Sequence, residues 1–342
     1  MMWLSHAVCT LLFAAADPPD WLERAVDSVL DPASYGFWGL QSNVFGLLAV
    51  ILVSLICGAV GSLVVGNRMA FFSDALAHTA FAGISVGFLV ALFVGVLDRP
   101  GAFFDWATPI MVVFGILVGL AIAYVRETTA LSSDTVIGVF FAGAMGFGAM
   151  LLTSIRQMGN FLNPEDFLFG APATVRSGNL QVLFVLTVLT AAVLGLLYNQ
   201  LLFTTFNPSL ARSRRVWVRL CNYLFIALLA LIINICLRTV GALLINALLI
   251  VPAATACNLC RNLRQLFWVT VGVCLAVGVS GYLLAWRLRV VFPDGRKLSF
   301  GAGGTIVVLS VVLFFLSLAV AAARRRGNRR PGGQPLKTPA AP

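Results

Sequence analysis

The sequence predicts an all-α, polytopic membrane protein of about nine transmembrane helices, and two observations carry this prediction. The first is composition: 60% of the 342 residues are hydrophobic and only 11% are charged, whereas soluble globular domains carry about 25% charged residues. The second is that the apolar residues gather into repeated runs of about 20, the length that a helix needs to cross a bilayer core. A soluble enzyme, a disordered protein and a disulfide scaffold are all poor fits to such a composition.

Nine apolar stretches in order along the chain are the expected spans. They are residues 44–65, 70–96, 107–125, 134–154, 179–203, 218–237, 240–257, 265–286 and 304–323. The 31 glycines and 14 prolines suit packed transmembrane helices, in which small residues allow close approach and neighbouring helices satisfy freed backbone groups. The chain therefore divides into residues 1–43 (a leader and an extracytoplasmic segment), a transmembrane domain at 44–323, and a tail at 324–342.

The two ends of the chain are expected to differ from this domain. Residues 3–16 are apolar but too short to span a membrane. Ala14–Ala16 before Asp17 is typical of a signal-peptidase site, yet no basic residues precede it, so cleavage of residues 1–16 stays open. Residues 324–342 are basic and rich in proline and glycine, which predicts a disordered tail attracted to anionic lipid.

The distribution of basic residues predicts the orientation. Lysine and arginine are enriched on the cytoplasmic side of membrane proteins, so the basic tail is placed inside, and nine spans then place the N-terminus outside. The expected inside segments also hold Arg68, Arg126, Arg212, Arg214, Arg215, Arg219, Arg261 and Arg264. The net charge of +10 is assigned to these loops and the tail. A nucleic-acid surface is not expected, because no soluble stretch interleaves basic with aromatic residues.

Motifs for the commonest hydrolytic chemistries are absent from the sequence. No GxxxxGK[ST] loop occurs, so the chain cannot hydrolyse ATP by the P-loop mechanism. HExxH and GxSxG are also absent, which removes the commonest zinc-protease and serine-hydrolase interpretations. The chain is therefore not expected to be an enzyme.

Asp74 and His78 are the two ionisable residues that share one apolar segment. Their i,i+4 spacing places them on one helix face. A rise of about 1.5 Å per residue puts Asp74 roughly 9 Å and His78 roughly 15 Å beyond Arg68 at the inner interface. A carboxylate and an imidazole one turn apart can jointly hold a divalent cation. Spacing alone leaves three roles open: metal handling, a structural pair and a proton relay.

The segment around this pair resembles a known family. Residues 74–83, Asp-Ala-Leu-Ala-His-Thr-Ala-Phe-Ala-Gly, are similar to the D-A-L-S-H-x-x-x-x-G signature of metal-type ABC-transporter permeases. Residues 133–143, 166–170 and 240–256 resemble, in the same order, the family's E-D-x-x-I-G-x-x-F, D-x-x-x-x-L-F-G and V-G-x-L-L-x-x-A-L-L-I-x-P-A-A-T-A segments. The matches cover roughly residues 44–290, and the resemblance implies the fold of type II ABC importer permeases.

A further segment resembles the family's F-D-P-x-x-A loop, which is thought to dock on the ATPase subunit. It is Phe-Asn-Pro-Ser-Leu-Ala-Arg at residues 206–212, and the carried-over residues are Asn207, Pro208, Ala211 and Arg212. Asn207 as helix cap with Pro208 at the first helical position is favourable local chemistry for a short coupling helix. An ordinary interhelical loop is the alternative. The chain departs from the family at residues 213–215, Ser-Arg-Arg, which makes the loop more basic.

The resemblance implies a multi-pass permease subunit in the cytoplasmic (inner) membrane that imports a divalent transition metal by alternating access. The partners expected are an ATP-binding ABC subunit, an extracytoplasmic metal-binding protein, a second permease copy and the lipid bilayer. No cofactor is expected, since the metal is the substrate.

Asp74 and His78 of two copies would offer the ligands for the metal. Because His78 is the only histidine in these spans, manganese and iron stand beside zinc. An ATP-independent metal/proton transporter is the alternative.

Two further polar residues each have two interpretations. Asp134 lies at the start of an expected span behind two serines, so it either stabilises the helix start or lies on a metal exit path. Asn246 lies within the span that contains Pro252. A buried amide needs partners, so Asn246 either bonds to another helix or lines the pathway.

Overall fold

The computed structural model describes residues 37, 40–94, 102–157, 175, 177–206, 218–260, 262–291 and 297–328. Its helices are α3 (Gln41–Gly66), α4 (Ala70–Val94), α5 (Ala102–Thr128), α6 (Ser133–Gln157), α8 (Ser177–Phe206), α10 (Val218–Val240), α11 (Ala242–Leu259), α12 (Leu263–Arg287) and α13 (Ala302–Asn328). Within these residues, nine helices are long and apolar enough to cross a membrane. The expected all-α membrane fold is confirmed, and most helices run a few residues beyond the predicted spans.

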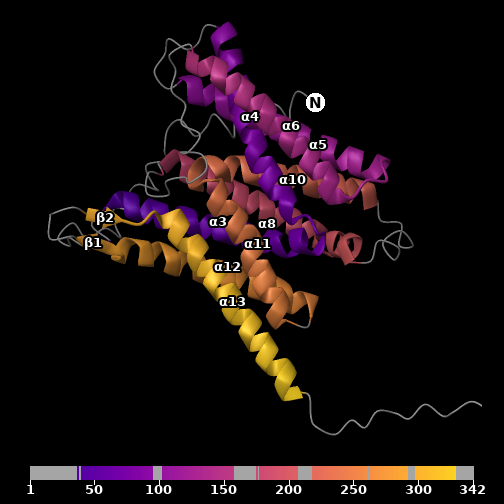
Figure 1. Cartoon of the computed structure of the whole chain (residues 1–342), viewed down its shortest axis with the longest axis vertical. Coiled ribbons are helices and arrows are strands. Elements are labelled where there is room, and N and C mark those ends of the chain that lie inside the picture. Colours follow the sequence, from indigo (N-terminus) through magenta and orange to yellow (C-terminus); the bar gives the residue numbers. More distant parts are fainter. Residues whose placement is uncertain are drawn as a thin grey trace, which may run out of the picture.

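A short hairpin was not expected from the sequence. It consists of β1 (Arg289–Val291) and β2 (Lys297–Ser299), which pair antiparallel with Val290 opposite Leu298. Strands of three residues are too short to show an alternating apolar pattern. The hairpin lies between α12 and α13, at the end of the bundle where α3 begins (Figure 1).

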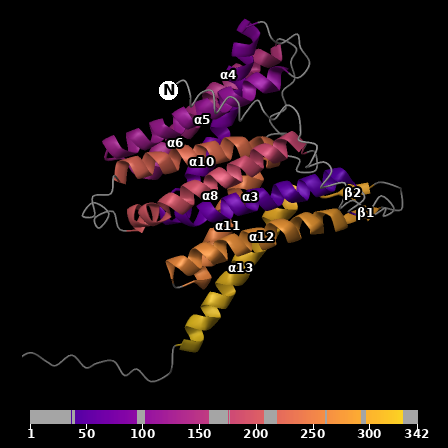
Figure 2. The same cartoon turned by 180° about the vertical axis from the view of Figure 1, so that it is seen from behind.

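The helices pack in three groups (Figures 1 and 2). The first group is α4, α5 and α6, in which α4 packs against both of the others. The second is α3, α8, α10 and α11, which occupies the middle of the molecule, and α10 joins it to α4 and α5. The third is α12 and α13, which pack against one another and against α11. Helix α3 contacts α8, α10, α11 and α12, so the core of the bundle is built on it.

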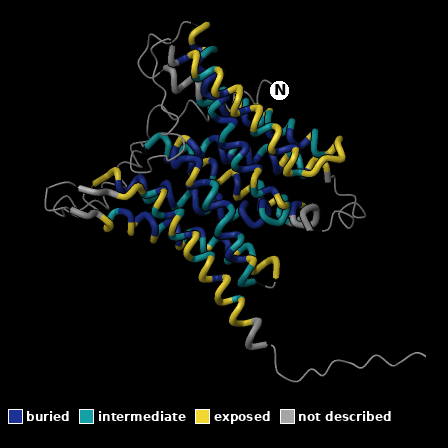
Figure 3. Tube along the Cα trace, viewed as in Figure 1, coloured by how far each residue is buried: buried dark blue, intermediate teal, exposed yellow. Residues whose placement is uncertain are grey.

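Burial follows this arrangement (Figure 3). In α3, 67% of the most apolar stretch is buried inside the molecule, against 17% in α6 and 17% in α13. The exposed side chains of α6 and α13 are themselves large and apolar, such as Val139, Met150 and Phe315. In a membrane-spanning chain such a surface faces lipid or another subunit.

Glycines let α3 lie this close to its neighbours. A β-carbon at Gly58 would lie 2.8 Å from the Cα of Val271 in α12. A β-carbon at Gly61 would meet the backbone carbonyl of Leu249 in α11. Small residues at such contacts allow helix backbones to approach closely in membranes, so these two positions hold α11 and α12 against the core.

The connection between α10 and α11 is a single residue, Gly241. Its dihedral angles are φ 86° and ψ 156°, a combination that is essentially restricted to glycine. The chain changes direction between the two helices within this one residue. The backbone conformation of Gly241 therefore sets the direction in which α11 leaves α10.

Pro252 lies inside α11 and leaves one backbone carbonyl without its usual helical donor. Proline has no N–H group, so the carbonyl four residues back, at Leu248, receives no bond from it. The Cys274 thiol of α12 donates to this oxygen, at 3.4 Å between Sγ and O. The neighbouring helix therefore supplies the missing donor, and α11 continues to Leu259.

Candidate functional site

The turn between α3 and α4 determines where the helix of the candidate site begins. The Arg68 N–H donates to the Val65 carbonyl and the Met69 N–H donates to the Val64 carbonyl, both at 3.1 Å. Arg68 has a φ of 55°, and Met69 is buried. This is the Schellman pattern of helix termination, with a left-handed residue followed by an apolar one. Helix α4 starts directly after it at Ala70.

Asp74 and His78 lie on one face of α4, as their spacing predicts. The distance between His78 Nε2 and Asp74 Oδ1 is 3.6 Å. The exposed fraction of the side chain is 19% for His78 and 45% for Asp74. Both residues belong to a span of the chain that can cross a membrane, so a half-exposed carboxylate lies on the surface of a membrane-spanning helix.

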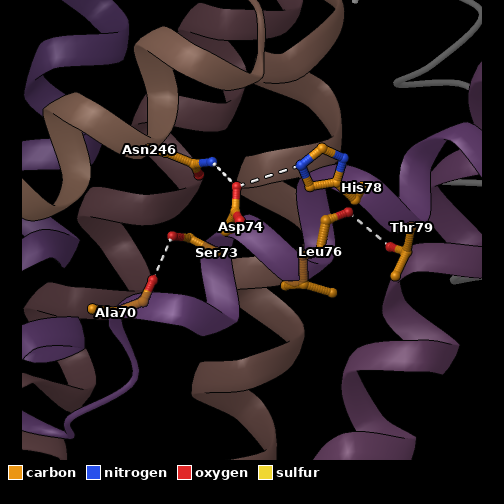
Figure 4. Close-up of polar contacts among 7 residues, drawn as sticks. All are labelled: Ala70, Ser73, Asp74, Leu76, His78, Thr79 and Asn246. Atoms are coloured by element: carbon orange, nitrogen blue, oxygen red, sulfur yellow. Dashed lines mark hydrogen bonds and ion pairs between the residues drawn. The ribbon is translucent and has the colours of Figure 1, made fainter. Parts of the chain in front are cut away.

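The structure adds Asn246 to this pair (Figure 4). Asn246 comes from α11, and its Nδ2 donates to Asp74 Oδ1 at 2.8 Å. Asp74 lies between His78 on its own helix and Asn246 on the other. The sequence left Asn246 with two roles, interhelical bonding and lining the pathway. The observed contact is an interhelical bond made directly to the candidate ligand.

Two polar atoms of the site are buried without a hydrogen-bond partner in the part of the chain that the structure describes. They are His78 Nδ1 and Asn246 Oδ1. Buried polar atoms in native proteins are generally paired with protein or water. Unpaired atoms beside a carboxylate therefore mark a place where water or a bound cation can supply the partner.

Aromatic side chains surround the imidazole of His78. The Phe141 ring of α6 lies edge-on to it with 5.0 Å between ring centroids, and the Phe81 ring lies 5.8 Å away. Phe141 contacts the imidazole from a second helix, and nothing in its local sequence singled it out. The only sequence feature that could have pointed to Phe141 is its place in the segment at residues 133–143, which resembles the family pattern.

The hydroxyl groups next to the pair do not take part in the site. Ser73 Oγ donates to the Ala70 carbonyl at 3.0 Å, and Thr79 Oγ1 donates to the Leu76 carbonyl at 2.7 Å (Figure 4). Both hydroxyls are thus bonded to α4 itself. The polar groups that face one another are those of Asp74, His78 and Asn246.

Asp134 lies apart from this cluster. It is exposed in the first turn of α6, where Ser132 Oγ accepts a bond from the Thr135 N–H at 3.2 Å. A carboxylate in the first turn of a helix interacts favourably with the helix dipole. This geometry favours a role at the helix start. The residues predicted to couple to the ATPase, Asn207, Pro208, Ala211 and Arg212, lie outside the described residues, between α8 and α10 in the sequence.

A single chain offers an incomplete set of metal ligands. Within the described residues, no group of three or more His, Cys, Asp and Glu side chains could hold a metal ion. Asp74 and His78 supply one carboxylate and one imidazole, and Asn246 adds an amide oxygen. Divalent transition metals usually take four to six ligands, so water or a second chain would have to supply the rest.

Comparison with known proteins places this architecture among transporter subunits. Residues 41–321 match the model of the ABC 3 transport family. The chain is 27% identical over 295 residues to the manganese import system permease protein ScaB of Streptococcus parasanguinis, across 85% of this chain and 95% of that protein. It is 30% identical over 273 residues to the manganese transport system membrane protein MntC of Halalkalibacterium halodurans, across 79% of this chain and 84% of that protein.

A solved structure has the same fold. It is PsaBC from Streptococcus pneumoniae in complex with Fab, with a TM-score of 0.67 to this chain. The alignment covers 85% of this chain and 95% of that chain at 23% sequence identity. At that identity the likeness concerns the fold.

Proposed function

Because this chain belongs to the ABC 3 transport family of metal-type ABC permeases, we propose that it is the membrane-spanning subunit of an ATP-driven manganese importer. The substrate follows from the relatives ScaB and MntC, which are named for manganese import and transport. It also follows from the ligand chemistry, since carboxylate and amide oxygens suit manganese while additional imidazoles would favour zinc. Zinc and iron are the competing substrates that a test has to include.

The observation that carries this proposal is the exposure of Asp74. Its side chain is 45% exposed within a membrane-spanning helix. A carboxylate at that depth is too costly to place against hydrocarbon, so such residues face a bundle interior or a water-filled pathway. The face of α4 with Asp74 and His78 therefore lines a pathway for cations or meets a second copy of the chain across one.

Two copies of the chain would complete the site. Asp74 and His78 from both copies supply two carboxylates and two imidazoles, which is a sufficient set for a divalent cation. Conduction requires that the ion leaves as well as binds. A site assembled between two subunits meets this requirement, because a small movement of one subunit separates the ligands. Alternating access driven by ATP would supply that movement.

The remaining partners follow from the family and the charge distribution. An ATP-binding subunit would dock on the segment with Asn207, Pro208, Ala211 and Arg212, and an extracytoplasmic binding protein would deliver the metal. The chain would lie in the cytoplasmic membrane with its N-terminus outside and its C-terminus inside. Hydrolysis would take place in the partner, and the permease itself would not be an enzyme.

Metal uptake by whole cells tests the proposal. A strain that lacks this chain should take up radioactive manganese poorly, and uptake should return when the chain is expressed together with its ATP-binding partner. Uptake in the presence of a partner that cannot hydrolyse ATP is the control. Full uptake with the inactive partner would contradict ATP-driven import and favour a secondary transporter. Zinc and iron in parallel assays identify the preferred cation.

A further inference from the structure

Asn246 makes the shortest polar contact of the site. Its Nδ2 lies 2.8 Å from Asp74 Oδ1, whereas His78 Nε2 lies 3.6 Å from the same oxygen. The bond joins residues 172 positions apart in the sequence, on α11 and α4. Asp74 is thus held more closely by the amide of another helix than by the imidazole of its own.

The chemistry of an amide suits this position. A carboxylate with 45% of its side chain exposed has room to change rotamer, and a hydrogen bond from a second helix restricts it. Outer partners of this kind orient ligating carboxylates and tune a metal site. An amide does so without a positive charge, whereas lysine or arginine would neutralise Asp74 and repel the cation.

The second atom of the same amide is unused. Asn246 Oδ1 is buried and has no hydrogen-bond partner among the described residues. A neutral amide oxygen is a ligand that manganese accepts readily, whereas zinc prefers nitrogen and sulfur. With this oxygen, each chain offers two oxygen-bearing groups for one imidazole.

We propose that Asn246 is a positioning and selectivity residue: its N–H orients the Asp74 carboxylate and its carbonyl oxygen favours manganese over zinc in the pathway. This inference rests on the proposed function and specifies how the same site chooses its cation.

The test measures manganese uptake by cells that express the complete importer, together with the zinc concentration that halves this uptake. The main variant is Asn246→Leu, which removes donor and acceptor at similar volume. Asn246→Gln keeps the amide and is the conservative variant. Manganese uptake at low concentration should fall on the order of tenfold in Asn246→Leu, as it does when the outer partner of a metal ligand is removed. The inhibitory zinc concentration should also fall by about tenfold. Asn246→Gln should recover most of both.

A matched control is available on the same helix. Asn258 of α11 also makes an interhelical bond, from its Nδ2 to Ser317 Oγ of α13 at 3.1 Å, away from the site. Asn258→Leu should leave the inhibitory zinc concentration unchanged. If Asn246→Leu does not reach the membrane, Asn246→Ser, whose hydroxyl is too short to reach Asp74, replaces it with the same expectation.

The outcomes separate this inference from the proposed function. Parental zinc sensitivity in Asn246→Leu, or in Asn246→Ser where it replaces that variant, with or without a lower manganese uptake, would overturn the selectivity role and leave the manganese importer intact. An importer whose parental form takes up no divalent cation would overturn the proposed function, and the inference with it.

Discussion

At the scale of single residues, the carboxylate of Asp74 is the group around which the site is arranged. His78, one turn further along α4, and Asn246, on α11, both present a nitrogen to its Oδ1. The Phe141 ring then limits the orientation of the His78 imidazole. Each of these contacts acts on one of the two proposed ligands, and three helices contribute to them.

Near-isosteric substitutions test these two ligands. Asp74→Asn and His78→Gln keep volume and hydrogen-bonding capacity but weaken metal ligation. Truncation would instead leave one partner of the pair uncompensated. Both variants should insert and assemble with the ATP-binding partner at parental levels. Metal uptake should fall by at least about tenfold, the smallest loss that follows removal of a partner of a metal ligand.

Ser73→Ala is the control for these variants. Ser73 precedes Asp74 on the same helix and is buried, but its hydroxyl bonds to the carbonyl of Ala70 within α4. Its loss should leave uptake near the parental level. If Asp74→Asn or His78→Gln assembles normally and transports at the parental rate, that residue is a structural partner and not an essential ligand.

At the scale of elements, the position of α11 depends on the one-residue turn at Gly241. The dihedral angles of Gly241 are strained for any residue with a β-carbon, at a cost of about 1–3 kcal/mol. Gly241→Ala should therefore lower the thermal unfolding midpoint of the purified protein and reduce uptake, because α11 carries Asn246. Gly195→Ala in α8 is the matched control, since a β-carbon there meets nothing within 4 Å. Equal midpoints for the two variants would contradict this account of the turn.

The hydrogen bond from the Cys274 thiol to the Leu248 carbonyl is a second feature of α11 that can be tested. In a Pro252→Ala chain the new N–H can donate to this carbonyl, so the thiol is no longer needed there. Cys274→Ala should therefore lower the unfolding midpoint less in the Pro252→Ala background than in the parental background. Coupling of residues that share a partner is about 0.5–3 kcal/mol. Strictly additive effects in the double-mutant cycle would show that the two residues act independently.

At the scale of the whole molecule, nine helices of the described residues are long and apolar enough to cross a membrane. If each of them crosses it once, we expect the α5–α6 turn and the β1–β2 hairpin to lie on opposite sides. Thiol labelling tests this in a chain whose Cys9, Cys257 and Cys260 are replaced by serine. A membrane-impermeant maleimide should label Ser299→Cys in intact cells and Thr129→Cys only after permeabilisation. Labelling of Thr129→Cys from outside would reverse the predicted orientation.

The segment at residues 207–215, which is predicted to couple to the ATP-binding partner, gives a second prediction at this scale. It connects α8 and α10 on the side predicted to be cytoplasmic. A cysteine at Ser209 should crosslink to the ATP-binding partner in membranes. Ser299→Cys, in β2 on the side predicted to be extracytoplasmic, should not crosslink. A Ser209→Cys chain that transports metal but forms no crosslink would argue for an ordinary loop at these residues.

The sequence alone predicted the membrane-spanning helices, because the length and apolarity of a span are local properties of the chain. It also predicted that Asp74 and His78 share a face, since the period of a helix fixes which neighbours along the chain coincide. The exact ends of the helices were less well predicted, because helices continue into polar residues beyond the hydrocarbon. The β1–β2 hairpin was missed because strands of three residues carry no periodic signal.

Only the tertiary structure decided which distant groups meet. Asn246 and Asp74 are 172 residues apart, and Cys274 and Leu248 are 26 residues apart. Both contacts depend on how α11 packs against its neighbours. Helix packing follows from the close approach of small residues such as Gly61 and from the turn at Gly241, and these are properties of pairs of helices. The sequence therefore determined the spans and the candidate ligands, while packing determined which groups contact those ligands and which of their polar atoms have no partner among the described residues.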